Sequence, residues 1–255
     1  MEELSFATYI ILFLTGALAG FVDSIAGGGG IVTVPVLLSI GIPPHLALGT
    51  NKLQSSFGSL TAAVNYTRKG LVDPRKMMLA ICCTIIGAVT GTLTIQQIST
   101  EFLRHAIPIF LAAILVYSIF SPSFGESDRS AKINRSLFHL SGGFILGFYD
   151  GFFGPGAGSF WTIGFVILLG YNLKTATAHT KVTNFTSNFS SLAVFLIAGK
   201  VLFLAGLVMG CGQICGAAIG SRLVIRNGIR FIRVIFLLVV SLTILKVMFD
   251  TYFAR

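Results

Sequence analysis

The stretch Gly20–Gly30, which reads GFVDSIAGGGG, decides the fold class of this chain. It places an aspartate and four consecutive glycines directly behind an apolar run, Thr8–Val22. A carboxylate is costly in lipid and glycine weakens a helix, so neither suits an ordinary membrane span. A second stretch, Gly147–Gly158, repeats the pattern as GFYDGFFGPGAG. The recurrence indicates two broken crossings of the same kind rather than one defect in a helix.

The composition is that of a protein that lies mostly in a membrane. The 255 residues are 54% hydrophobic and 11% charged, with a mean hydropathy of +0.87, whereas a soluble domain is about 25% charged. Several apolar runs approach or reach the ~20 residues that a helix needs to cross a bilayer. They are Thr8–Val22, Met77–Leu93, Phe102–Phe120, Val201–Ile219 and Phe231–Phe249. The sequence therefore predicts an all-α polytopic membrane protein.

An internal repeat relates the two halves of the chain. Asp23 and Asp150 are 127 positions apart, and Lys52 and Lys181 are 129 apart. The second spacing also relates Gly87 to Gly216, Gly91 to Gly220, and Arg104 to Arg233. We therefore expect a first transmembrane repeat over residues 1–121, a polar linker over 122–135 and a second repeat over 136–255.

Each half reads as five apolar segments. The first is expected to end at the aspartate, and the second is a short run of about ten residues, Ile31–Ile40 or Ser159–Leu169. Such a run is too short for an ordinary span and is typical of one half of a broken crossing. The fold expected is two five-segment repeats, each with a short helix broken by glycine. The count is ten segments, or eight if the short runs are re-entrant loops.

Basic clusters in the loops predict that the two repeats are inverted. In the first half the cluster lies between the third and fourth segments, and in the second half between the fourth and fifth. Its members are Arg68, Lys69, Arg75 and Lys76 in one half, and Arg222, Arg226, Arg230 and Arg233 in the other. If both clusters are cytoplasmic, the halves cross the membrane in opposite directions. The linker is then cytoplasmic and both termini lie outside.

The glycine-rich breaks predict an anion site. Inverted repeats with broken helices are typical of secondary transporters, whose sites lie where the repeats meet. Unwound backbone at membrane depth is tolerated when it lines a polar cavity. A helix restarting at Ile31 or Ser159 would direct unpaired N–H groups toward an anion. The glycines expected to contact it are Gly28, Gly29, Gly30, Gly156 and Gly158.

A polar cluster follows each short run and places a lysine at the same repeat position. These clusters are Gly49–Ser56 and His179–Asn184. A cation inside the membrane needs a partner or a polar cavity, so the lysines either contact the anion or make structural ion pairs. The candidate substrate-binding side chains are Asn51, Lys52, Gln54, His179, Thr180, Lys181 and Asn184.

Asp23 and Asp150 directly follow apolar spans, whereas the other seven acids lie in loops or near the termini. Three roles are open to them. They can form a salt bridge or helix cap, carry a coupling proton, or ligate substrate or a cation. The first is favoured because charges inside the membrane are usually paired. The four cysteines have no His or acid partner at metal-ligand spacing, and no metal or other cofactor is expected.

At these residues the chain resembles the TauE/SafE family of sulfite and organosulfonate exporters. The stretches that carry the resemblance are Gly20–Asp23, Gly27–Gly30, Gly49–Lys52, Gly147–Gly158 and Ala178–Asn184. They occur in order across nearly the whole chain. The resemblance implies a multi-pass inner-membrane transporter of small sulfur-containing anions such as sulfite, sulfonates or sulfoacetate-like compounds.

We therefore expect a secondary transporter that moves such an anion by alternating access. An anion channel, or a transporter of another small organic anion, is the alternative. An enzyme is not expected, because the two acids lie in opposite repeats and no Ser/His or metal-binding pattern accompanies them. No ATP-binding motif is present, so ATP is not expected to be the direct energy source unless a partner protein supplies it. The expected partners are a small anion and the lipid bilayer, with a coupling proton and a homodimer left open. The basic residues orient the chain in the membrane, so no nucleic acid is expected.

Small residues four apart recur at matching places in the two halves. They are Gly16/Gly20, Gly87/Gly91, Gly143/Gly147/Gly151 and Gly212/Gly216/Gly220. This spacing allows helices to approach closely, so we expect these glycines at helix contacts.

Overall fold

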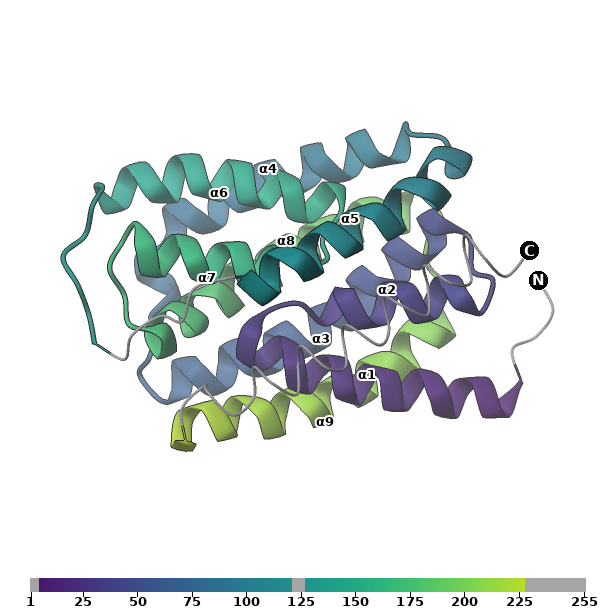
Figure 1. Cartoon of the computed structure of the whole chain (residues 1–255), viewed down its shortest axis with the longest axis horizontal. Coiled ribbons are helices and arrows are strands. Elements are labelled where there is room, and N and C mark those ends of the chain that lie inside the picture. Colours follow the sequence, from purple (N-terminus) through teal and green to yellow (C-terminus); the bar gives the residue numbers. More distant parts are fainter. Residues whose placement is uncertain (1–4, 121–126, 228–255) are drawn as a thin grey trace.

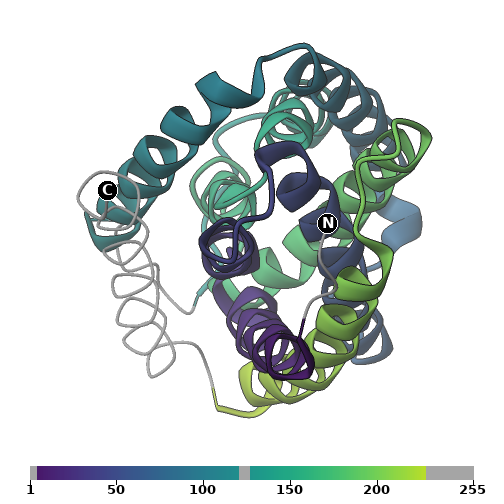
Figure 2. The ribbon, with the colours of Figure 1, turned by 90° about the vertical axis from the view of Figure 1, so that its right-hand side faces the viewer.

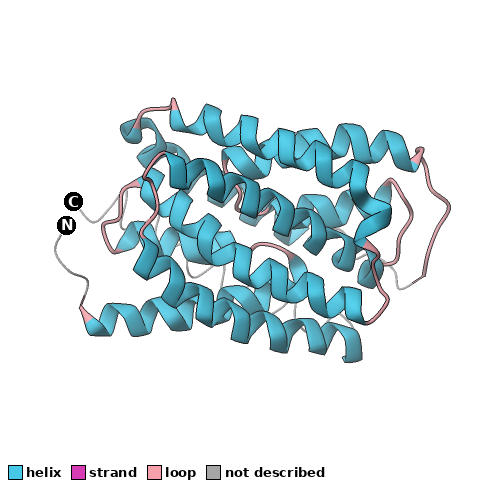
Figure 3. Ribbon diagram, turned by 180° about the vertical axis from the view of Figure 1, so that it is seen from behind, coloured by secondary structure: helices cyan, strands magenta, loops and turns pink. Residues whose placement is uncertain are grey.

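The computed structural model describes residues 5–120 and 127–227, and over these residues it is helical with no strand (Figures 1 and 3). The helices are α1 Phe6–Ala26, α2 Gly29–Ser39, α3 Pro44–Arg68, η1 Pro74–Met77, α4 Met78–Gln96, α5 Thr100–Phe120, α6 Arg135–Phe152, α7 Ala157–Ile167, α8 Leu173–Ile197 and α9 Phe203–Asn227. The expected all-α fold is confirmed. The predicted segment Phe231–Phe249, with Arg230 and Arg233, lies outside the described residues.

Within the described residues, three helical stretches are long and apolar enough to cross a membrane: Phe6–Ile25, Pro74–Gln96 and Phe203–Arg226. Viewed along the long axis, the helices form a bundle (Figure 2). Large apolar side chains are exposed on its outside, as in Ile86 of α4 and Ile219 of α9. Two further helices of 25 residues each, α3 and α8, instead bury polar side chains along much of their length and pack against each other. This is the arrangement expected where lipid surrounds a polar centre.

Two pairs of helices make the closest contacts, α1 with α9 and α4 with α6. Gly16 lies against the main chain of Met209, and Gly20 lies against that of Gln213. The contacts advance in the same direction along both helices, so α1 and α9 run parallel (Figure 1). Between α4 and α6 the corresponding contacts are Gly87 with Phe144 and Gly91 with Phe148. The expectation that the small-residue ladders lie at helix contacts is confirmed.

We expect Gly151→Ala to lower the free energy of unfolding by about 1–3 kcal/mol, the usual effect of overpacking. A Cβ at Gly151 would overlap the main chain of Ala88 on α4, which cannot move without separating the two helices. Gly142→Ala on the same helix is the control, because the nearest atoms to its Cβ would be those of the Phe138 side-chain ring, at 3.1 Å or more, and not main-chain atoms. Thermal melting in detergent measures both variants, and equal melting temperatures would contradict the packing argument.

The two short helices, α2 and α7, have eleven residues each and begin at Gly29 and Ala157. The breaks expected near the two glycine-rich stretches are therefore present. The helices before them do not end at the aspartates, however, since α1 continues to Ala26 and α6 to Phe152. Each aspartate stays within the last turns of its helix because its carboxylate is hydrogen-bonded there, as described below. In Figure 1, α2 lies to the right of the centre and α7 to the left.

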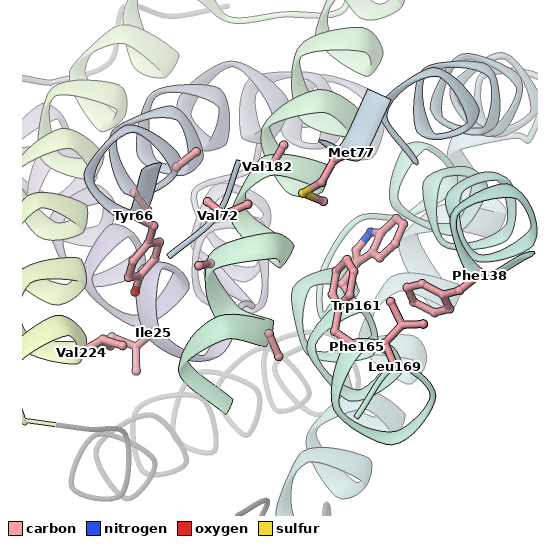
Figure 4. Packing of buried hydrophobic residues seen from close by; sticks show 14 residues of the cluster. Ile25, Tyr66, Val72, Met77, Phe138, Trp161, Phe165, Leu169, Val182 and Val224 are labelled. Atoms are coloured by element: carbon pink, nitrogen blue, oxygen red, sulfur yellow. The ribbon is translucent and has the colours of Figure 1, made fainter. Parts of the chain in front are cut away.

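One apolar cluster joins the two halves of the chain (Figure 4). It combines Ile25 and Tyr66 from the first half with Trp161, Phe165 and Phe138 from the second. The Tyr66 hydroxyl donates to the carbonyl of Ser24, which ties α3 to the end of α1. The cluster therefore fixes the position of the helix ends from which both breaks emerge.

Candidate functional site

The two helix breaks touch each other at their main chains. A Cβ placed on Gly27 would lie 2.6 Å from the Cα of Gly158, and one placed on Gly158 would lie 2.6 Å from the Cα of Gly27. The Ser159 hydroxyl donates to the carbonyl of Gly27 at 2.8 Å. Real side chains do not tolerate such distances, so only glycine permits this crossing.

Asp23 and Lys181 form one of two buried ion pairs beside this crossing. Lys181 Nζ lies 3.1 Å from Asp23 Oδ2, and its side chain is fully buried. The other carboxylate oxygen, Oδ1, accepts the main-chain N–H groups of Gly28 and Gly29 at 3.0 and 3.2 Å. The first N–H groups of the α2 region are thus bound by a carboxylate of the protein itself.

Asp150 and Lys52 form the second pair. Lys52 Nζ lies 2.6 Å from Asp150 Oδ1 and also donates to the main-chain carbonyl of Asp150. The remaining oxygen, Asp150 Oδ2, accepts the Ser187 hydroxyl. Lys52 is 1% exposed and Asp150 3%. The four charges of the two pairs cancel, which makes their burial tolerable.

Each pair joins a residue of the first half to one of the second. Asp23 on α1 binds Lys181 on α8, while Lys52 on α3 binds Asp150 on α6. In both pairs the lysine donors are directed at a carboxylate. An anion that enters this site must therefore compete with an aspartate for each lysine.

A network of amides and hydroxyls extends from Lys52 along α3. Asn51 Oδ1 accepts the Thr33 hydroxyl at 2.6 Å and the Gln54 amide at 2.7 Å. The Gln54 carbonyl oxygen in turn accepts the amide of Gln213 on α9. These residues are buried, so the network supplies the polar partners that such groups need away from water.

Polar groups also line α8 near Lys181. The hydroxyls of Thr180 and Thr162 lie 3.0 Å apart, which links α8 to α7. Asn184 directs its Nδ2 toward Gly158, where an added Cβ would lie 2.7 Å from that nitrogen. The side-chain amide oxygen of Asn184, Oδ1, is buried without a hydrogen-bond partner among the described residues.

The structure gathers most of the candidate residues around the crossing, but not His179. Gly30 lies beside Asn51 and Pro155, and Gly156 caps α7 in a left-handed conformation. His179 packs against the rings of Tyr171 and Phe165, and its Nδ1 lies 2.8 Å from the Thr175 carbonyl oxygen. Residues two apart on a helix point in nearly opposite directions, so His179 faces away from Lys181.

Three residues outside the predicted set also belong to the site: Thr33, Ser187 and Gln213. Ser187 follows Lys181 and Asn184 at intervals of three residues, a spacing that places all three near one helix face. Gln213 is an amide inside an otherwise apolar run, which is itself a signal of function. Thr33 carries no comparable signal in the sequence.

The outer helices are apolar and surround a buried centre in which opposite charges are paired. This arrangement is that of a polytopic membrane protein with a polar core at the depth of its spans. The family model described as "Sulfite exporter TauE/SafE" matches residues 12–247. The chain belongs to this family and is a membrane transporter.

Relatives from several bacteria resemble nearly the whole chain. The "Probable membrane transporter protein YfcA" of Escherichia coli (strain K12) is 43% identical over 242 residues, covering 95% of this chain and 90% of that protein. A "Probable membrane transporter protein" of Haemophilus influenzae is 43% identical, with 94% of each chain covered. One from Sinorhizobium sp, "ORF9", is 42% identical, covering 94% of this chain and 92% of that protein. No solved structure gives a significant match.

Proposed function

We propose that the protein is a secondary transporter that moves a small sulfur-containing anion across the inner membrane by alternating access. The observation that carries the proposal is the presence of two buried lysine–aspartate pairs, Asp23 with Lys181 and Asp150 with Lys52, at the crossing of two helix breaks. The substrate class follows from the family, whose description is that of a sulfite exporter. Sulfite and sulfonates are oxyanions that lysines, amides and peptide N–H groups bind well.

We infer that the halves 1–121 and 136–255 are inverted repeats. The repeat spacing of 127 residues relates Asp23 to Asp150, and the spacing of 129 relates Lys181 back to Lys52. Exchanging the two halves therefore turns the Asp23–Lys181 pair into the Asp150–Lys52 pair. They also convert the contact of Gly20 with Gln213 into that of Gly147 with Thr84. Contacts that exchange in this way support a two-fold relation between the halves, and alternating access commonly moves one repeat against the other.

We further infer that the linker, 122–135, is cytoplasmic and that the termini lie outside. The end of α3 and the start of α6 lie at the left of Figure 1, whereas α1 begins at the right. Lys174 Nζ at the start of α8 donates to the Ile225 carbonyl at the end of α9. The basic loops of both halves thus gather at one end of the bundle, as the positive-inside rule requires of the cytoplasmic end.

In the proposed mechanism, the anion displaces a carboxylate from its lysine. Lys52 and Lys181 supply the charge, and neighbouring donors complete the site. These donors are the N–H groups of Gly30, Gly156 and Gly158, with the side chains of Asn51, Gln54, Thr180 and Asn184. The N–H groups of Gly28 and Gly29 already bind Asp23 and hold the edge of the site. A carboxylate that loses its lysine is unfavourable while charged, so a proton that neutralises it would favour anion entry. No covalent step is needed, and the chain acts as a transporter rather than an enzyme.

The test is counterflow in proteoliposomes. Vesicles preloaded with unlabelled sulfite, sulfoacetate or methanesulfonate should accelerate uptake of the same labelled anion by at least tenfold, with saturation. Lys52→Met and Lys181→Met should abolish the acceleration. Flux that is linear in concentration and shows no counterflow would indicate a channel, and no flux for any sulfur-containing anion would overturn the proposed substrate class.

Binding can be measured separately from transport. An anion that binds only the native protein stabilises it by about 2.7 kcal/mol at a hundredfold excess over Kd. We therefore expect sulfite or a sulfonate to raise the melting temperature of the purified protein in detergent. Chloride at the same ionic strength is the control, and an equal rise with chloride would mean that the site does not select sulfur-containing anions.

A further inference from the structure

The two buried carboxylates are held by different kinds of donor. Asp23 Oδ1 accepts two main-chain N–H groups, from Gly28 and Gly29, in addition to the bond between Oδ2 and Lys181. Asp150 has no such main-chain donor among its described hydrogen bonds, and its Oδ2 accepts the hydroxyl of Ser187 instead. The spacing of 129 relates Ser187 to Gly58, which has no side chain to offer Asp23. The two ion pairs are therefore not equivalent.

This difference determines which carboxylate can be protonated without losing its hydrogen bonds. A main-chain N–H can only donate, so the two N–H groups at Asp23 favour the charged carboxylate. A hydroxyl can donate or accept. Ser187 Oγ also lies 3.1 Å from the carbonyl of Asn184, a second acceptor for its hydrogen. Ser187 can therefore turn its hydrogen to Asn184 and accept one from Asp150.

We propose that Asp150 is the proton-binding carboxylate of the transport cycle, with Ser187 as its reversible hydrogen-bond partner, while Asp23 remains ionised and holds the α2 break. This inference rests on the proposed function and assigns different tasks to residues that the repeat makes equivalent. Ser187 is a positioning residue, since it acts through Asp150.

Protonation of Asp150 changes the charge of the ion pair while its hydrogen bonds are kept. A proton from water binds Asp150 Oδ2, and the resulting carboxylic acid donates to Ser187 Oγ, whose own hydrogen turns to the Asn184 carbonyl. Lys52 loses its charged partner but stays on the main-chain carbonyl of Asp150. Its positive charge is then available to a monovalent anion. One proton and one such anion cross together without net charge, and deprotonation returns Lys52 to Asp150 on release.

The surroundings of Asp150 leave Lys52 as its immediate charged neighbour. Lys52 approaches from α3 and Ser187 from α8, both at hydrogen-bond distance. On the side of α4, the Thr92 hydroxyl donates to the Gly151 carbonyl and carries no charge. The adjacent Tyr149 donates its hydroxyl to the Pro155 carbonyl. Among the contacts of the described residues, a change in the charge of Asp150 therefore acts first on Lys52.

The experiment separates anion exchange from proton-driven uptake of methanesulfonate, which stays singly charged over the pH range used. Exchange of one anion for another needs no net movement of protons. Accumulation driven by an inward proton gradient requires a proton to enter with each anion. We expect Asp150→Asn to lose at least 90% of gradient-driven accumulation, and we expect whatever exchange it retains no longer to depend on pH. Asp23→Asn should lower both activities, but the exchange that remains should keep its pH dependence. Pyranine trapped in the vesicles reports the proton that accompanies each anion.

Ser187→Ala tests the hydrogen-bond partner without touching either charge. We expect gradient-driven uptake to fall at least fivefold and its pH dependence to shift, and we expect Ser187→Thr to restore most of the uptake and the wild-type pH dependence. Ser190→Ala is the control, because that hydroxyl bonds only to the Thr186 carbonyl on the same helix. Exchange in Asp150→Asn that keeps the wild-type pH dependence, or a Ser187→Ala protein indistinguishable from the control, would overturn the assignment. Absence of exchange in the wild-type protein would instead refute the proposed function.

Discussion

Replacing Lys181 by methionine is expected to lower the free energy of unfolding by about 3–5 kcal/mol, the usual effect of removing one partner of a buried ion pair. The effect is large because the Asp23 carboxylate then loses its counter-charge in a site where its side chain is only 12% exposed. The two N–H groups of Gly28 and Gly29 remain, but they are partial charges and compensate only in part. Urea unfolding in detergent micelles measures the loss.

A double variant distinguishes the ion pair from the packing of the lysine stem. Asp23→Asn combined with Lys181→Met removes both charges, so most of the lost stability should return. Transport should not return, because the lysine that would bind the anion is gone. The exposed pair of Asp73 and Lys76, 4.0 Å apart, is the matched control, and Lys76→Met should change stability by less than about 0.5 kcal/mol. Equal effects for Lys181→Met and Lys76→Met would contradict the argument.

The helical fold and the two breaks were predictable from composition and from the glycine-rich stretches. The repeat spacing places a lysine and an aspartate at matching positions, and intramembrane charges usually pair. The sequence alone does not say which lysine meets which aspartate, since that depends on how the halves pack. In the structure each pair joins opposite halves, with Asp23 bound to Lys181 and Lys52 to Asp150.

The details of the breaks were less predictable, for a physical reason. Helices were expected to end at the aspartates, but hydrogen bonds to each carboxylate let α1 and α6 continue beyond Asp23 and Asp150. Ser187 and Thr33 are ordinary helix residues by type, and only the tertiary fold brings them to the site. His179 adjoins the lysine motif in sequence, yet the helical rotation directs it to an aromatic cluster.

Replacing Gly27 by alanine is expected to reduce transport at least tenfold and to lower the melting temperature more than the same change at Gly70, which also has a positive φ. Two effects combine at this residue. Its φ of 69° is one that side chains rarely adopt, and its Cβ would lie 2.6 Å from the main chain of Gly158. The first costs about 1 kcal/mol. The clash with Gly158 forces the two helix breaks apart. Their contact fixes the relative positions of the two ion pairs.

Gly70→Ala isolates the backbone effect, because Gly70 has a φ of 71° and nothing lies within 4 Å of an added Cβ. That variant should lose about 1 kcal/mol and keep transport within about twofold. Gly158→Ala isolates the crossing, since it carries no positive φ but meets Gly27 at the same 2.6 Å. If the crossing is the decisive contact, Gly158→Ala should lower counterflow and the melting temperature about as much as Gly27→Ala does. If Gly27→Ala instead resembles Gly70→Ala in counterflow and in melting temperature, the breaks can separate freely and their contact does not control transport.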